Sequence, residues 1–118
     1  MPSPDDMRYK FSLRPAYGSE KMLIEFISGV EREEFLPDFL DALKSCHPKL
    51  ESALDLWMND EVQFVVDSDH GNFLLSKDAW GFGFVWSDEN QHGVQNIHDL
   101  LSRDARFEKV PALDRRTG

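Results

Sequence analysis

The side chains of this chain that could do chemistry are mostly carboxylates, and one segment holds most of them. Residues 20–69 carry 13 acidic and four basic residues, which accounts for the whole net charge of −9. Such a segment repels nucleic acid and attracts a basic protein, whose association the field accelerates. We therefore expect a basic protein partner and no nucleic acid. The predicted partner-binding residues, on or near two central helices, are Glu31, Glu34, Asp38, Asp41, Glu51, Asp55, Asp60 and Glu61.

Metal-binding and catalytic patterns are weak. In Asp67-x-Asp69-x-Gly71 the glycine stands at position 5 of a calcium loop instead of 6, so a solvated hairpin turn is favoured. Cys46, His47, His70, His92 and His98 form neither a HxxxH nor a HExxH pair. We expect no catalytic site, metal or cofactor, and hence no enzyme. The single cysteine excludes a disulfide framework and favours the cytoplasm.

The stretch Trp80–Trp86, WGFGFVW, is the most aromatic in the chain. In a strand Trp80, Phe82, Phe84 and Trp86 share one face, while the two glycines lie on the other. Four exposed rings would form a large aggregation-prone patch, so this face is predicted to be core beneath the helices. The glycine face would then permit close approach of a partner or another backbone. A stacking platform for bases also requires basic residues, and none lie nearby.

The elements in the first half of the chain follow from hydrophobic periodicity. Strict alternation predicts a strand over 7–13, ending before Pro15. Residues 20–27 are favoured as a helix, although a buried strand is the open alternative. A helix is expected from Pro37, with Phe39, Leu40 and Leu43 buried. Another is expected over 48–59, where Leu50, Ala53, Leu54 and Trp57 recur at i, i+3, i+4 and i+7.

In the second half the period changes to two. Strands are predicted over 61–66, 73–75 and 80–86, with turns at 67–71 and 77–78. A helix over 90–103 would bury Val94, Ile97, Leu100 and Leu101, and Phe107 and Val110 would pack after it. The fold class is therefore α+β: a three-stranded antiparallel meander plus an N-terminal strand, packed by three to four helices. Residues 1–118 form one domain, with 1–6 and 112–118 expected to be flexible.

Several of these pieces resemble the SUKH superfamily, which includes many bacterial immunity proteins that neutralise toxins by binding them. The resemblance rests on the acidic run before Leu36-Pro37-Asp38-Phe39-Leu40, the hairpin around Gly71, Phe84-Val85-Trp86 and the closing helix. An Asn-Gly turn follows the Leu-Pro helix in that family, whereas Ser45-Cys46-His47-Pro48 stands here. No individual functional residue carries over from the resemblance.

The leading hypothesis is a non-enzymatic acidic binding protein, namely an immunity protein that neutralises a toxin through its carboxylates. The first alternative is a secretion-type chaperone for an effector protein, which would be a dimer with an apolar groove. The second is a small-ligand-binding or enzymatic domain that uses the aromatic sheet face. No apolar run reaches the length of a membrane span, so a cytoplasmic monomer or homodimer without membrane contact is expected.

Overall fold

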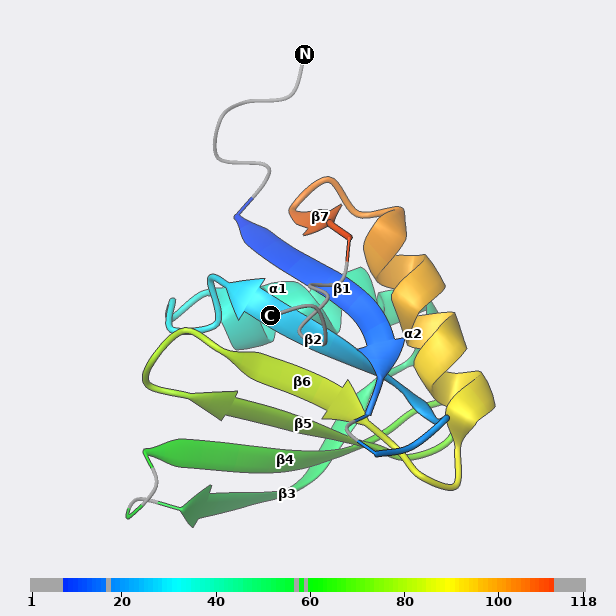
Figure 1. Cartoon of the computed structure of the whole chain (residues 1–118), viewed down its shortest axis with the longest axis horizontal. Helices are drawn as coiled ribbons and strands as arrows, with labels where there is room; N and C mark the ends of the chain where they lie inside the picture. The colour runs from blue at the N-terminus through cyan, green and yellow to red at the C-terminus, as the bar shows by residue number, and fades with distance from the viewer. Residues whose placement is uncertain (1–7, 17, 57, 59, 112–118) are drawn as a thin grey trace.

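Strands account for most of the regular structure (Figure 1). The computed structural model describes residues 8–16, 18–56, 58 and 60–111, and the expected flexibility of 1–6 and 112–118 falls outside these ranges. The elements are β1 (Tyr9–Pro15), β2 (Met22–Ser28), α1 (Phe35–Ala42), the 3₁₀ turn η1 (Lys44–Cys46), β3 (Lys49–Leu56), β4 (Glu61–Asp67), β5 (Phe73–Asp78), β6 (Gly83–Trp86), α2 (Gln91–Ser102) and β7 (Phe107–Lys109).

All seven strands of the described chain join one mixed sheet in the order β3-β4-β5-β6-β2-β1-β7. Every neighbouring pair is antiparallel except β1 and β7, which are parallel. The predicted three-stranded meander with an N-terminal strand and three to four helices is therefore wrong. Two of the segments expected to be helical are strands, and the described residues contain only two α-helices.

Cross-strand pairing assigns each side chain to one of two sheet faces. One row runs through Leu13, Ile24, Val85, Leu75, Phe64 and Ala53. The next runs through Ser12, Glu25, Phe84, Ser76, Gln63 and Leu54. The first row lies on the core face, because Ile24, Leu75 and Val85 are fully buried. We call the other side the open face; α1 lies behind the sheet in the view of Figure 1.

Aromatic rings fill the core between the sheet and both helices. Phe26 of β2 contacts Phe35 and Phe39 of α1 edge-on, with ring centroids 5.1 and 5.9 Å apart. From α2, Val94, Ile97 and Leu101 join the same buried cluster. Each fully buried side chain of this size stabilises the fold by about 1.5–3 kcal/mol. This core packs against one face of the sheet.

The run Met22–Ser28 is a strand, so the favoured helix over 20–27 is wrong and its alternative is confirmed. The strand lies in the middle of the sheet between β1 and β6. A central strand can be apolar on both faces, which removes the alternation that marks an exposed strand. Leu23 and Ile24 are accordingly both buried, although they point to opposite faces.

Residues 49–56 are likewise a strand, β3, and not the predicted amphipathic helix over 48–59. Leu50 and Leu54, expected to be buried, are exposed on this edge strand, while Trp57 lies outside the described residues. A left-handed turn at His47 (φ 53°) and the following Pro48 direct the chain into pairing with β4. The i, i+3, i+4, i+7 spacing of apolar residues is thus coincidental here.

The WGFGFVW stretch has the predicted side-chain alternation in β6, but its two faces are reversed. The strand covers only Gly83–Trp86, and Gly83 and Val85 lie on the core face. A Cβ on Gly83 would lie 2.5 Å from the Ser76 backbone oxygen, so neighbouring β5 explains this glycine. Trp80 and Phe82 belong to the β5–β6 turn and are exposed, so their predicted burial is wrong. The expected turn at 77–78 lies slightly later, since β5 continues to Asp78.

Several other local predictions are confirmed, although β1 extends through Pro15 instead of ending before it. Tyr9 and Phe11 of β1 are fully buried, α1 buries Phe39, and Gly71 takes the expected positive φ (94°) in the β4–β5 turn. Helix α2 begins after Asn90, whose side chain accepts a hydrogen bond from the Gly93 amide. Phe107 packs after α2 as predicted and also starts the short strand β7.

Candidate functional site

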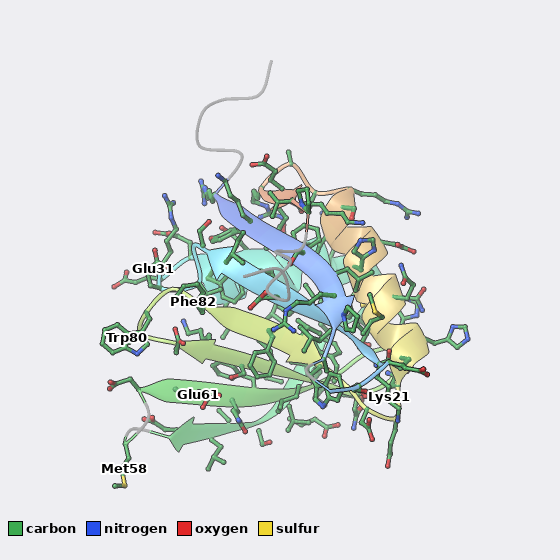
Figure 2. The ribbon with its side chains drawn as sticks, viewed as in Figure 1. Lys21, Glu31, Met58, Glu61, Trp80 and Phe82 are labelled. Carbon is green, nitrogen blue, oxygen red and sulfur yellow. The ribbon has the colours of Figure 1, made fainter. Side chains whose placement is uncertain are left out.

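Three of the five large exposed apolar side chains among the described residues lie at one end of the sheet, while Leu50 and Leu54 are exposed along β3. Met58 is 80% exposed, Trp80 72% and Phe82 50%. These three come from the β3–β4 and β5–β6 turns, which lie side by side because β4 pairs with β5 and the Ala79 amide donates to the Asp60 carbonyl (2.9 Å). Figure 2 shows Met58 and Trp80 projecting from this end, with Phe82 close by. We call these three residues the hairpin-end surface.

Carboxylates border the hairpin-end surface. Glu31 approaches from the β2–α1 turn, and its Oε2 lies 2.9 Å from where a Cβ on Gly81 would be. Gly81 has φ 93°, so a glycine suits both this backbone conformation and the close carboxylate. Asp78 Oδ1 accepts hydrogen bonds from the amides of Trp80 (2.9 Å) and Phe82 (3.0 Å). These bonds fix the turn that presents the two aromatic rings to solvent.

A pocket of about 470 Å³ opens beside this surface on the open face of the sheet. Its lining comprises Arg14, Glu25, Glu61, Ser76, Asp78, Phe82, Gly83 and Phe84. Arg14 donates two hydrogen bonds to Glu25, from Nε (2.9 Å) and Nη2 (3.3 Å), so these two charges compensate each other. Glu61 accepts hydrogen bonds from the hydroxyl of Ser76 and the amide of Gln63. The remaining pocket is acidic, with aromatic walls.

The eight predicted partner-binding acids do not form one face. Glu31, Asp60 and Glu61 lie at the hairpin-end surface or its pocket. Glu34 stands at the start of α1, and Glu51 and Asp55 are exposed on the edge strand β3 instead of on a helix. Asp38 and Asp41, on α1, take part in ion pairs within the chain. The structure therefore brings together three of the eight.

Asp38 is the centre of an ion-pair network that joins α1 to β1 and to the α2–β7 turn. Its carboxylate accepts hydrogen bonds from the Tyr9 hydroxyl (2.7 Å), Arg8 (3.1 Å) and Arg106 (3.2 Å). Arg106 also donates to Asp104 (2.7 Å) and Asp41 (2.9 Å). Burial, together with the Asp38 carboxylate, raises the pKa of Tyr9, so its hydroxyl stays protonated and continues to donate. This arrangement gives Asp38 a structural role.

The histidines and the cysteine lie apart from this site. His47 pairs with Asp69 (2.7 Å) and His98 with Asp99 (3.0 Å), and no group of three potential metal ligands occurs among the described residues. Asp69 of the weak calcium pattern is therefore engaged with His47. Burial raises the pKa of the Cys46 thiol, and a thiol that stays protonated is a poor nucleophile.

Sequence reasoning missed the apolar half of the site. The alternation in WGFGFVW correctly placed Phe84 and Trp86 on one side, but periodicity does not say which side the helices cover. Asp78 gave a detectable signal, because an aspartate two residues before Trp80 is typical of a side chain that accepts turn amides. Met58 gave none, since it lay within the segment predicted to be helical.

Comparison with known protein families, with characterised proteins and with solved structures finds no significant match to this chain. In the part of the chain that the structure describes, neither helix has the length and apolarity needed to cross a membrane.

Proposed function

We propose that this chain is a non-enzymatic binding protein that uses the hairpin-end surface and its surrounding carboxylates to bind a basic protein. The observation that carries the proposal is the exposure of Trp80, Phe82 and Met58 together at one end of the sheet. Tryptophan, phenylalanine and methionine are enriched in protein interfaces, and tryptophan is over-represented among residues that dominate binding energy. Two turns joined by a backbone hydrogen bond present these side chains with little loss of entropy on binding.

The charge indicates the chemistry of the partner. Glu31, Asp60, Glu61 and Asp78 lie around the apolar residues. An acidic border steers a basic partner and disfavours acidic proteins and nucleic acid. The net charge of −9 strengthens this long-range field. A cytoplasmic immunity protein that binds a basic toxin is the particular function we propose, in keeping with the resemblance of the sequence to the SUKH superfamily.

The first experiment identifies and then measures the partner. The full-length chain is immobilised, proteins that bind from the source cells are identified, and a purified candidate is titrated by calorimetry. We expect Trp80→Ala to weaken binding by about 2 kcal/mol or more, as for a central interface tryptophan.

Two control variants separate the loss of binding in Trp80→Ala from the nonspecific effect of any surface substitution. Leu50→Ala also removes an exposed apolar side chain of β3, but at the end of the strand that pairs with Val66. Glu20→Gln removes a charge next to Lys21, which Figure 2 places far from Trp80. Both variants should bind within about two-fold of the wild type. Equal binding by Trp80→Ala and Leu50→Ala would refute the proposed surface.

A further inference from the structure

The pocket on the open face places two carboxylates of neighbouring strands opposite each other. Glu61 of β4 and Asp78 of β5 are direct cross-strand partners on that face. Residues directly opposite in an antiparallel pair have Cβ atoms about 4.5–5.5 Å apart, and like charges there destabilise the sheet. Among the described residues no ion pair includes either carboxylate. Two like charges therefore stand opposite each other on adjacent strands, with no basic partner among the described residues.

The nearest lysine along the chain does not compensate these two charges. Lys77 precedes Asp78 but lies on the core face, where its Nζ is 3.4 Å from the Val30 carbonyl and 6.0 Å from the centre of the Phe35 ring. Arg14, which also lines the pocket, is held by two hydrogen bonds to Glu25. A cation between Glu61 and Asp78 would therefore have to come from outside the described residues.

The lining indicates which kind of cation fits. Calcium takes six to eight oxygen ligands, whereas Phe82 and Phe84 line this pocket beside the carboxylates. Aromatic walls and paired carboxylates together suit a guanidinium group, which stacks on rings and donates planar hydrogen bonds to carboxylates. An ammonium group is more strongly hydrated and gains less from the rings. The volume of about 470 Å³ lies within the range of pockets that enclose a ligand group.

We propose that the pocket receives an arginine side chain of the basic protein partner, with its guanidinium between Glu61 and Asp78 and its plane against Phe82 or Phe84. This inference rests on the proposed function, because it names the partner residue that the carboxylates would recognise. The hairpin-end surface would contact apolar groups on the partner, and the pocket would hold the arginine beside them. Binding would also remove the repulsion between the two carboxylates.

The test uses the full-length chain and a capped Gly-Arg-Gly peptide, titrated at low salt and followed through backbone amide NMR signals. We expect the signals of Glu61, Ser76, Phe82 and Phe84 to shift. A peptide with citrulline in place of arginine, which has nearly the same shape without the charge, should bind about ten-fold more weakly. Equal binding of the two peptides would overturn the proposal.

Isosteric variants test the named carboxylates. Glu61→Gln and Asp78→Asn keep an oxygen that accepts the hydrogen bonds of Ser76 and of the turn amides. Each substitution should weaken binding of the arginine peptide roughly ten-fold, while Glu20→Gln should leave this binding unchanged. Their urea midpoints should equal or exceed that of the wild type, because each removes one of two repelling charges. Lowered midpoints in both variants would instead indicate that the acids support the fold, and would overturn the inference.

Other occupants give distinguishable results. Calcium binding that Glu61→Gln abolishes would replace the arginine assignment with a metal site. A dimer in sedimentation that Asp78→Asn dissociates would identify a second copy as the occupant. The chain also has Arg115 and Arg116, and tighter peptide binding after replacement of both by alanine would identify its own C-terminal segment. Each of these outcomes would overturn the proposal.

Trp80 does not line the pocket, so Trp80→Ala tests the hairpin-end surface separately from arginine binding in the pocket. If Trp80→Ala loses the protein partner while the arginine peptide does not bind, only the pocket assignment fails. If the peptide binds through Glu61 and Asp78 but Trp80→Ala retains the protein partner, only the hairpin-end surface fails.

Discussion

Asp38 provides the sharpest test of whether the carboxylates of α1 serve folding or binding. Its side chain is only 15% exposed and accepts hydrogen bonds from Tyr9, Arg8 and Arg106. Asp41 lies one turn further along α1, has a side chain that is 53% exposed, and pairs only with Arg106 in the described network. The two aspartates share helix, charge and size but differ in burial, which makes Asp41→Ala a matched control.

The expected cost of Asp38→Ala follows from these contacts. A hydrogen bond to a charged group contributes about 1.5–3 kcal/mol, and three such bonds on one carboxylate are not additive. Arg8 and Arg106 stay partly solvated, and Arg106 retains Asp104, which reduces the loss. The main penalty is the Tyr9 hydroxyl, left without its acceptor. We therefore expect Asp38→Ala to lower the free energy of unfolding by about 2–3 kcal/mol, and Asp41→Ala by less than about 1 kcal/mol.

Equilibrium urea denaturation of both variants measures these values. A double-mutant cycle with Tyr9→Phe isolates the hydroxyl–carboxylate contact, whose coupling should be about 1 kcal/mol. Equal destabilisation by Asp38→Ala and Asp41→Ala would refute the assignment of Asp38 to the fold. So would an unchanged stability of Asp38→Ala combined with weaker partner binding, the result that the sequence alone predicted for this residue.

Two further predictions concern a glycine in β6 and the loss of folding stability at low pH. Gly83→Ala should destabilise the protein by about 1–3 kcal/mol in urea, because the new methyl would meet the Ser76 backbone oxygen at 2.5 Å; an unchanged midpoint would contradict the close approach of β5. Hydrogen bonding from Arg106 lowers the pKa of Asp104 below its ordinary value of 3.8. The stability from this shift is present above that value and is lost as the pH falls through the lowered pKa, so Asp104→Asn should flatten the decline in stability below about pH 4. An unaltered decline in a pH series of urea titrations would exclude this contribution.

The predictable parts of the fold were those in which local pattern and tertiary environment agree. The alternation in Tyr9-Lys10-Phe11 and the helical spacing of Val94, Ile97 and Leu101 in α2 each define an element without help from the rest of the chain. Segment 48–59 was mistaken because four apolar residues at helical spacing also suit an edge strand, and only pairing with β4 distinguishes the two. Met22–Ser28 was ambiguous because a central strand is apolar on both faces.

The candidate site divides in a similar way. Glu31, Asp60 and Glu61 were predicted from charge, which is readable without a fold. Trp80 and Phe82 were predicted to be buried. That prediction assumed that the helices cover the face of the strand with the four aromatic rings. The helices cover the glycine side instead, and nothing local specifies that choice.

The position of β1 and β2 in the sheet has a consequence for how the chain acquires its structure during synthesis. These two strands are synthesised before the other strands of the sheet, yet they pair with β6 and β7, which are made much later. Phe26 pairs with Gly83 of β6, and Tyr9 pairs with Phe107 of β7. Neither pairing can form until the later residue has been synthesised. The β1–β2 hairpin therefore has two unpaired edges for most of translation, and such non-local pairing slows folding and favours aggregation of the nascent chain. A ribosome stalled before Phe107 would hold a chain whose N-terminal strand still lacks its outer neighbour.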